Sequence, residues 1–228
     1  MKTRRSFSER LVQRFFYKYY ARNLLYELQT RARAESADYV QQQMQEARIF
    51  TSHRSLVEFA AQGASAQGLF LEFGVATGNT IRQIAASAPP GTTVFGFDSF
   101  SGLPGDWTGH VETAGAFRQR QVPKVPGNVT LLQGLFEETL PGFMAEHEGP
   151  ASFVHIDCDL YESTRTILDH IGPRLQSGTR VLFDEYFNYP GWKLHEFKAW
   201  KEFCESTGTR YSYLGFTSLD GRVLVEID

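Results

Sequence analysis

The sequence predicts an α/β fold in which a doubly wound sheet carries helices on both faces and follows a set of N-terminal helices. Three observations support this prediction. From residue 69 onward, short apolar runs that end in acidic residues alternate with segments of helical spacing. Clusters of glycine and proline separate several of these segments. The first 50 residues contain neither glycine nor proline, which favours helices there.

The composition is that of an ordinary globular protein. A chain of 228 residues can form one well-buried domain and an appendage, and 42% of it is hydrophobic and 21% charged. The net charge of -3 gives no reason to expect nucleic acid as a partner. Cys158 and Cys204 make neither a disulfide framework nor a cysteine-based zinc site, so we expect a cytoplasmic location. We expect no transmembrane segment and no secretory signal.

We divide the chain into an N-terminal helical extension, residues 1–66, and an α/β domain, residues 67–228. The extension is expected to form a basic helix, a second helix over residues 35–50 and a third over residues 53–62. Basic and apolar side chains interleave along its start: Lys2, Arg4, Arg5, Arg10, Arg14, Lys18 and Arg22 with Phe7, Leu11, Phe15 and Tyr19. Such a helix suits an acidic membrane surface, or it docks on the α/β domain or a second subunit. We favour docking, and a homodimer in which the extension covers a neighbour's site.

The first strand of the domain leads into a glycine turn. An apolar run at residues 69–71 is followed by Glu72, Gly74 and Gly78, and then by helical spacing. Strand, glycine turn and helix together bind nucleotide-like ligands at the carboxyl end of an α/β sheet. The spacing is not that of a dinucleotide fingerprint, and no Lys-Ser or Lys-Thr follows as in a P-loop. The acidic Glu72 suits a cationic ligand instead.

Five alternating units and a terminal hairpin predict a seven-stranded sheet whose last strand is antiparallel. We expect its strands near residues 69–71, 93–97, 129–133, 152–157, 180–183, 211–216 and 222–227. Asp98 closes the second strand, where nucleotide-binding folds read the ribose hydroxyls. A long loop to about residue 127 carries Trp107 and Phe117 and is expected to be a lid or substrate wall.

Four stretches in this order carry a family resemblance: LEFGVATGNT, FGFDSFSGLP, GLFEETLP and HIDCDLYEST. From residue 68 to 228 the chain resembles the class I S-adenosylmethionine (SAM) methyltransferases, which have a Rossmann-like sheet. It looks closest to the macrocin O-methyltransferase-like group, which methylates hydroxyls of sugars on natural products. The N-terminal helices carry no matching motif.

The resemblance implies a SAM site at the strand ends. Its residues would be Glu72, Gly74, Ala76, Gly78, Asp98, Ser99, Gly134, Leu135, Phe136 and Asp157. Among these, Glu72 and the two glycines after it would line the methionine part, Asp98 would hold the ribose, and residues 134–136 would edge the adenine.

The resemblance also implies a divalent ion, usually magnesium, held by Asp157, Asp184 and Glu185. Carboxylates are the ligands that such a hard cation prefers, and the ion would lower the pKa of a substrate hydroxyl. The family pattern usually has Asp-Asp where this chain has Asp184-Glu185, which leaves metal use open. Without a metal, the base would be Asp157, Glu185 or His195. We expect His155 to be a satisfied core histidine, and Asp159 to cap the exit of the fourth strand.

The leading hypothesis is therefore a SAM-dependent methyltransferase acting on a hydroxyl of a small molecule, such as a sugar or glycosylated metabolite. A nicotinamide-dependent dehydrogenase would need a glycine fingerprint that the chain lacks. A non-catalytic SAM-binding protein would not need the acids at three strand ends. A nucleic-acid methyltransferase is disfavoured by the negative charge and by the missing Asn/Asp-Pro-Pro-Tyr/Phe motif.

Overall fold

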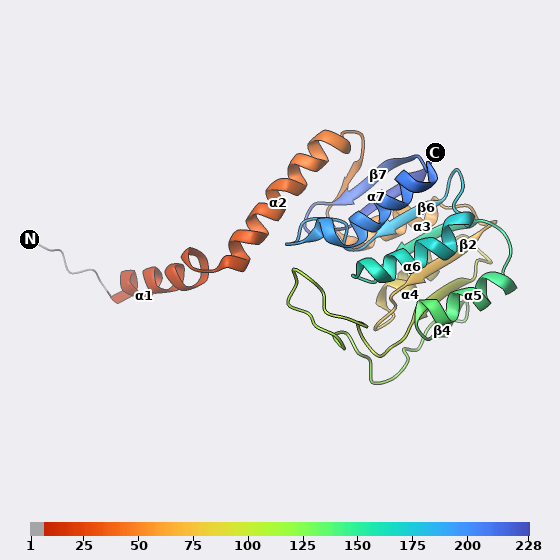
Figure 1. Ribbon diagram of the computed structural model, residues 1–228, viewed down its shortest axis with the longest axis horizontal. Helices are drawn as coiled ribbons and strands as arrows, with labels where there is room; N and C mark the ends of the chain where they lie inside the picture. Colours follow the sequence, from red (N-terminus) through yellow and green to blue (C-terminus); the bar gives the residue numbers. More distant parts are fainter. Residues whose placement is uncertain (1–6) are drawn as a thin grey trace, which may run out of the picture.

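The computed structural model describes residues 7–228, in which eight strands form one central sheet (Figure 1). The strands are β1 Arg48–Phe50, β2 Leu69–Phe73, β3 Val94–Asp98, β4 Val129–Gln133, β5 Ala151–Ile156, β6 Arg180–Phe183, β7 Tyr211–Thr217 and β8 Val223–Ile227. Their order in the sheet is β1-β7-β8-β6-β5-β2-β3-β4. The last strand, β8, runs antiparallel to both neighbours, as the sequence predicts, and the other pairs are parallel.

Helices cover both faces of the sheet, which confirms the predicted fold class (Figure 1). The described helices are α1 Phe7–Phe16, the π-helix η1 Tyr17–Ala21, α2 Leu24–Gln43, α3 His53–Gln62, α4 Asn79–Ser87, α5 Phe136–Glu146, α6 Tyr161–Ile171, η2 Gly172–Arg174, η3 Trp192–Leu194 and α7 Glu196–Thr207. One core lies between the sheet and α5, α6 and α7, and the other lies beneath α3 and α4. Because side chains alternate along a strand, Phe73 enters the first core and Phe70 the second.

The eighth strand, β1, is the one element that the sequence assigned to a different structure. Residues 35–50 were expected to be helical throughout, but α2 ends at Gln43 and residues 48–50 pair in parallel with β7. This pairing depends on a partner more than 160 residues away, Gly215, against which the Phe50 ring packs closely. A three-residue strand has no periodicity that separates it from the end of a helix.

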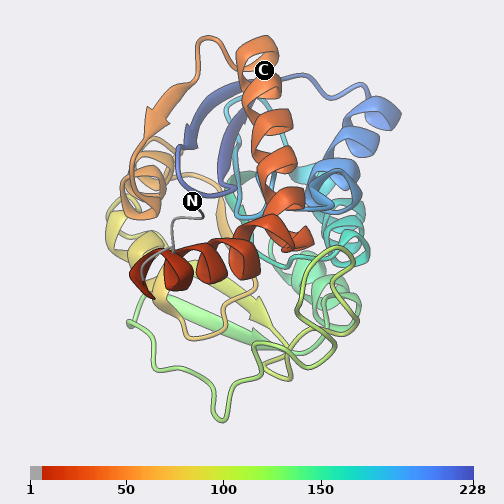
Figure 2. The ribbon, with the colours of Figure 1, turned by 90° about the vertical axis from the view of Figure 1, so that its left-hand side faces the viewer.

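The N-terminal segment has two parts with different environments. Residues 48–62 belong to the sheet domain as β1 and α3, although they precede the predicted boundary at residues 66 and 67. Helix α2 runs beside β7 and β8 (Figure 2). The Tyr39 hydroxyl on α2 lies 2.6 Å from the Tyr213 hydroxyl on β7. Helix α2 also contacts the segment after β6, because the Gln29 side chain donates to the Asn188 carbonyl oxygen.

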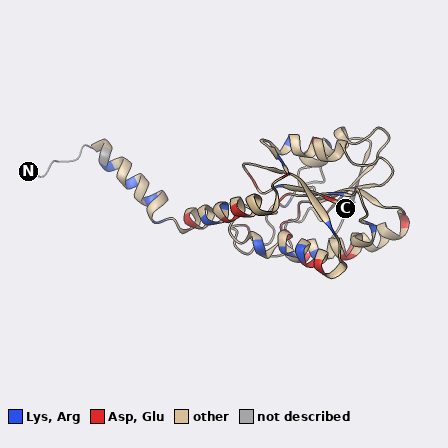
Figure 3. Cartoon of the chain, turned by 90° about the horizontal axis from the view of Figure 1, so that it is seen from above, with Lys and Arg blue, Asp and Glu red and all other residues tan. Residues whose placement is uncertain are grey.

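Helices α1 and η1, residues 7–21, form an N-terminal arm that points away from the sheet (Figure 1). Its apolar side chains are exposed, with 78% of Phe7 and 59% of Leu11 accessible. Arg10, Arg14 and Lys18 lie along the same arm, which Figure 3 shows as a series of basic positions. The predicted helix is confirmed, but it does not dock on its own domain. Lys2, Arg4 and Arg5 of the predicted basic stretch lie outside the described residues. Among the described helices, none is both long and apolar enough to cross a membrane.

Candidate active site

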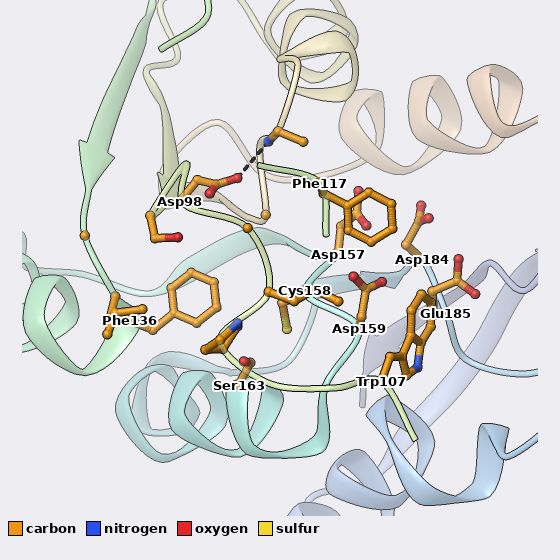
Figure 4. Close-up of a pocket in the computed structure, with 18 of the residues that line it drawn as sticks. Asp98, Trp107, Phe117, Phe136, Asp157, Cys158, Asp159, Ser163, Asp184 and Glu185 are labelled. Carbon is orange, nitrogen blue, oxygen red and sulfur yellow. Dashed lines mark hydrogen bonds between the residues drawn. The ribbon is translucent and has the colours of Figure 1, made fainter. Parts of the chain in front are cut away.

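A pocket of about 350 Å³ opens at the carboxyl edge of the sheet (Figure 4). The strands and loops that form it are those the sequence selected. Its wall includes Gly74 and Ala76 after β2, Asp98 and Ser99 at the end of β3, Gly134, Leu135 and Phe136 after β4, Asp157, Cys158 and Asp159 after β5, and Asp184 and Glu185 after β6. Leu103, Trp107 and Phe117 from the long loop complete it, which confirms that this loop is a pocket wall.

The backbone conformation of the turn after β2 explains its glycines, Gly74 and Gly78. Gly74 has φ +93°, and a Cβ there would lie 1.7 Å from the Asp157 carbonyl oxygen. Gly78 has φ +77° at the start of α4 and is not among the pocket-wall residues. Left-handed backbone and close approach of a neighbouring loop both favour glycine. These residues therefore shape the turn so that Ala76, which itself has φ +44°, can reach the pocket.

Asp98 fixes this turn against the end of β3. Its Oδ2 accepts the backbone N–H groups of Val75 and Ala76 at 2.8 and 2.7 Å, and Oδ1 accepts that of Phe100 at 2.6 Å. A carboxylate has about four acceptor positions, so about one remains for a ligand hydroxyl. Asp98 thus lies in the pocket wall as predicted, but most of its hydrogen-bonding capacity organises the loop.

The segment after β4 supplies an apolar side of the pocket. Phe136 begins α5, and its ring packs edge-on against Phe73 at a centroid distance of 5.6 Å. The backbone N–H of Leu135 donates to Glu138 at 3.1 Å, which holds the loop in place. This surface suits the flat ring that the sequence analysis expected near residues 134–136.

Three carboxyl groups, Asp157, Asp159 and Glu185, form what we call the acidic wall (Figure 4). Burial raises the pKa of Asp157 well above its ordinary value, and the negative charge of Asp184 raises it further. Burial, then Asp184, raises the pKa of Asp159 to about 7 and that of Glu185 to about 8. Groups that change protonation near neutral pH inside a pocket are suited to accept a proton from a bound ligand.

Asp159 is the functional candidate that the sequence analysis missed, because it was assigned to capping. Its backbone is left-handed, with φ +64°, which is uncommon for a residue other than glycine and is found often at functional sites. This conformation turns the buried side chain into the pocket. The spacing Asp-x-Asp directly after a buried strand was the available signal, since both acids then lie at the carboxyl end of that strand.

Asp184, although it borders the pocket, belongs to a second group that we call the buried charge network: Glu72, His155, Asp184 and Arg222. Arg222 binds both carboxylate oxygens of Asp184, from Nε at 2.6 Å and from Nη2 at 2.9 Å. Burial favours the neutral acid, but His155 and Arg222 outweigh it and hold the pKa of Asp184 below its ordinary value. One carboxylate of the predicted metal set therefore already has a cationic partner.

Glu72 lies in this network and not in the pocket wall, contrary to the prediction. It is fully buried on the α3 side of β2, and its Oε1 lies 3.0 Å from His155 Nδ1 on the neighbouring strand. Strand alternation explains the difference, because Glu72 points away from the face into which Phe73 points. His155 is buried as expected, but its Nε2 has no hydrogen-bond partner and lies 3.6 Å from Asp184 Oδ1. Burial disfavours its charge, yet Asp184 and Glu72 raise its pKa to about 9.

His195 does not face the pocket. It is 5% exposed and its Nε2 donates to the Thr108 carbonyl oxygen at 2.7 Å. Its ring lies edge-on to Trp107, which is the residue that forms the pocket wall there. Burial lowers the pKa of His195, and the imidazole is held as a structural donor. The geometry gives no support to the predicted role of His195 as a base.

The fold and this pocket together define an α/β enzyme of the class I methyltransferase type. Residues 71–186, about half of the chain, match the family model described as a methyltransferase domain, and the chain belongs to this family. A curated relative from Streptomyces olivaceus, 8-demethyl-8-(2,3-dimethoxy-alpha-L-rhamnosyl)-tetracenomycin-C 4'-O-methyltransferase, is 41% identical over 58 residues. That alignment spans 25% of this chain and 21% of the relative.

Solved structures support the fold. The calicheamicin methyltransferase CalS11 superposes with a TM-score of 0.59 at 22% identity, over 98% of this chain and 94% of that one. The O-methyltransferase NovP gives 0.58 at 21% identity, over 76% and 78%. TomG from Streptomyces achromogenes, an O-methyltransferase solved with SAM, gives 0.52 at 14% identity, over 98% and 99%. At these identities the likeness concerns the fold.

Proposed function

We propose that this protein transfers a methyl group from SAM to a hydroxyl oxygen of a small molecule, a sugar or a glycosylated metabolite. The observation that carries the proposal is the position of the acidic wall, which faces the glycine turn, Asp98 and Phe136 across one pocket (Figure 4). One end of the pocket thus suits a nucleoside, and the other suits a cation and a hydroxyl. The names of the relatives, which methylate hydroxyl oxygens, support this choice of substrate class.

The pocket residues fit SAM in shape and charge. SAM supplies a methyl group attached to a positively charged sulfur. Among the described residues, Asp157, Asp159 and Glu185 form no salt bridge, so a positive ligand would counteract the burial and the negative charge of Asp184 that raise their pKa values. Ser99 and Phe136 would contact the nucleoside end, with Asp98 offering its remaining acceptor position.

The chemical step requires a proton acceptor beside the substrate oxygen. The hydroxyl oxygen bonds to the methyl carbon while the carbon–sulfur bond breaks and its electron pair stays on sulfur. The hydroxyl proton passes to a carboxylate of the acidic wall, and the products are a methyl ether and S-adenosylhomocysteine. Asp159 and Glu185 suit this role because their pKa values lie near neutrality. Fixed orientation of the two reactants supplies much of the remaining rate.

We also propose that a divalent ion, magnesium, assists at this wall. The donors fit, because Asp157 and Glu185 offer the carboxylate oxygens that this ion prefers. Asp184, the third residue of the predicted set, would bind the ion while it also accepts hydrogen bonds from Arg222. When bound, the ion would polarise the substrate hydroxyl. The same acids could accept the hydroxyl proton without a metal. Methyl transfer measured with and without a chelator therefore distinguishes the metal-assisted mechanism from the metal-independent one.

The N-terminal arm suggests a homodimer, which we propose as the working assembly. Its exposed apolar face includes Phe7, Leu11 and Phe15, and such contiguous surface favours a protein partner. The N-terminal stretch that includes the arm is basic and the rest of the chain is acidic. The first 33 residues hold nine of the 23 Lys and Arg but only two of the 26 Asp and Glu. Replacing Leu11 and Phe15 by serine should convert dimer to monomer in light scattering, whereas replacing the half-buried Thr166 by serine should not. Both cysteines are free and buried, consistent with the cytoplasmic location that we propose.

The test of the function is methyl transfer itself. Purified protein would be incubated with SAM carrying a labelled methyl group and a panel of nucleotide-linked and glycosylated sugars, with magnesium or with EDTA. We expect label in a methyl ether of at least one hydroxylated sugar. Binding of SAM without transfer to any hydroxyl would favour a non-catalytic SAM-binding protein instead.

A further inference from the structure

A cluster of nitrogen and oxygen donors lies on the α3 side of the sheet edge, behind the acidic wall. His53 at the start of α3, His155 on β5 and Asp184 after β6 each offer one ligand atom, and these atoms all lie within 4.8 Å of one another. His155 Nε2 is 3.6 Å and His53 Nε2 is 3.9 Å from Asp184 Oδ1. Among the described residues, Asp157, Asp184 and Glu185 do not form a comparable set.

Two of these donors have no partner. His53 Nε2 and His155 Nε2 are both buried and lack a hydrogen bond, and the His155 side chain is fully buried. A buried nitrogen without a partner is costly unless something binds it. Since both atoms face the same carboxylate oxygen, a single bound group would satisfy both.

The other nitrogen of His155 is already committed. Its Nδ1 lies 3.0 Å from Glu72 Oε1, so Glu72 fixes both the tautomer and the direction in which Nε2 points. A carboxylate that orients a histidine in this way is the usual companion of a metal-binding imidazole. This gives the fully buried Glu72 a role other than the predicted contact with SAM.

The charges of the surroundings match a divalent ion. An ion bound at Nε2 would replace the proton that His155 otherwise carries there. With both histidines then neutral, Glu72, Asp184 and Asp220 carry three negative charges and Arg222, which pairs with the latter two, carries one positive charge. The balance of two negative charges equals the charge of one divalent cation. Arg222 binds Asp184 Oδ1 at 2.6 Å, and a carboxylate oxygen can accept this bond and bind a metal at once.

We propose that His53, His155 and Asp184 form a zinc site with a fourth position open to water. Two imidazoles and a carboxylate select zinc over magnesium, which prefers oxygen ligands. Zinc bonds of about 2.0–2.2 Å place tetrahedral ligand atoms about 3.4 Å apart, so the 3.6 Å and 3.9 Å separations from Asp184 Oδ1 would need to shorten by about 0.2 to 0.5 Å. The ion would join α3 to β5 and to the Asp184 side of the pocket. This proposal does not depend on methyl transfer.

The test uses the full-length protein, stripped with EDTA and titrated with cobalt(II) as a coloured substitute for zinc. We expect one equivalent to bind, with the intense visible absorption of a low-coordinate site, and zinc to displace it. Excess magnesium should leave the absorption unchanged. Displacement by magnesium as readily as by zinc, or no absorption at all, would overturn the proposal.

Variants locate the site. Because His53 is only partly buried, His53→Gln should fold normally and lose the cobalt spectrum, and Glu72→Gln should weaken zinc binding by about 10- to 100-fold. His170→Gln, which changes a half-buried histidine on α6, is the matched control and should bind as the parent does. Asp157→Asn and Glu185→Gln should also retain the spectrum, which separates this site from the magnesium site. Equal cobalt binding by His53→Gln and the parent would refute the assignment.

Discussion

Asp184 and Glu185 are adjacent in the sequence at the same sheet edge, Asp184 buried and Glu185 half-buried, yet they belong to groups with opposite properties. Asp184 lies in the buried charge network, where Arg222 and His155 hold its pKa below the ordinary value. Glu185 lies in the acidic wall, where burial and the charge of Asp184 raise its pKa to about 8. Of these neighbouring residues at the end of a strand, Asp184 thus has a cationic partner, whereas Glu185 has none and is a proposed participant in the reaction. Carboxyl groups without a cationic partner thus lie on the pocket side of the sheet edge, where we expect the methyl transfer to take place.

The largest difference should appear when one acid of the wall is neutralised. Asp159→Asn removes a proton acceptor without changing its size, so kcat should fall by about 10²- to 10⁴-fold. Binding of S-adenosylhomocysteine, measured by calorimetry, should change little. Ser163→Ala, which alters another pocket-wall residue, is the control and should keep most of the activity. A kcat for Asp159→Asn equal to that of the parent would remove Asp159 from the reaction.

Removing a charge from the buried charge network should lower the stability of the fold. Arg222→Met leaves Asp184 buried without its cationic partner, so the free energy of unfolding should fall by about 3–5 kcal/mol in urea denaturation with EDTA present. Adding Asp184→Asn should restore part of the loss. The exposed pair of Arg165 and Asp169 provides the control, and Arg165→Met should change stability by about 0.5 kcal/mol or less. An equal loss for the two arginine variants would contradict the distinction between paired core and exposed surface.

The pH dependence of the activity tests whether an acid of the acidic wall accepts the proton. If Asp159 or Glu185 accepts the hydroxyl proton, it must be ionised first, so kcat/KM should rise through an apparent pKa between about 7 and 8. In Glu185→Gln, any part of this rise that is due to Glu185 should disappear. A profile that is flat from pH 6 to 9 would exclude both residues as the acceptor.

Stability should depend on pH with the opposite sign. Because folding raises the pKa of Glu185 from 4.5 to about 8, the folded state binds more protons between these values. Its contribution to stability is therefore present below about pH 4.5 and is lost as the pH rises toward 8. Urea denaturation at pH 5 and pH 9 should show a smaller decrease for Glu185→Gln than for the parent. An equal decrease in both would mean that another group controls the pH dependence.

The comparison also shows which features the sequence could predict. Apolar runs located seven strands, and the acids that follow four of them located the pocket edge, because burial and strand ends leave a local signature. The conformation of Asp159 and the inward direction of Glu72 were missed, since they depend on a left-handed residue and on which sheet face each strand position meets. The partners His53 and Arg222 lie far along the chain from Asp184, so no local spacing connects them. His195 was selected by residue type, and only the fold shows that Thr108 already binds it.

The most direct test of the central claim, that the pocket at this edge is a SAM site, is calorimetric titration of the protein with S-adenosylhomocysteine, with NAD as the comparison ligand. We predict saturable binding of S-adenosylhomocysteine and none of NAD, with magnesium or with EDTA in the buffer. Absence of S-adenosylhomocysteine binding in both buffers, or tighter binding of NAD, would contradict the account.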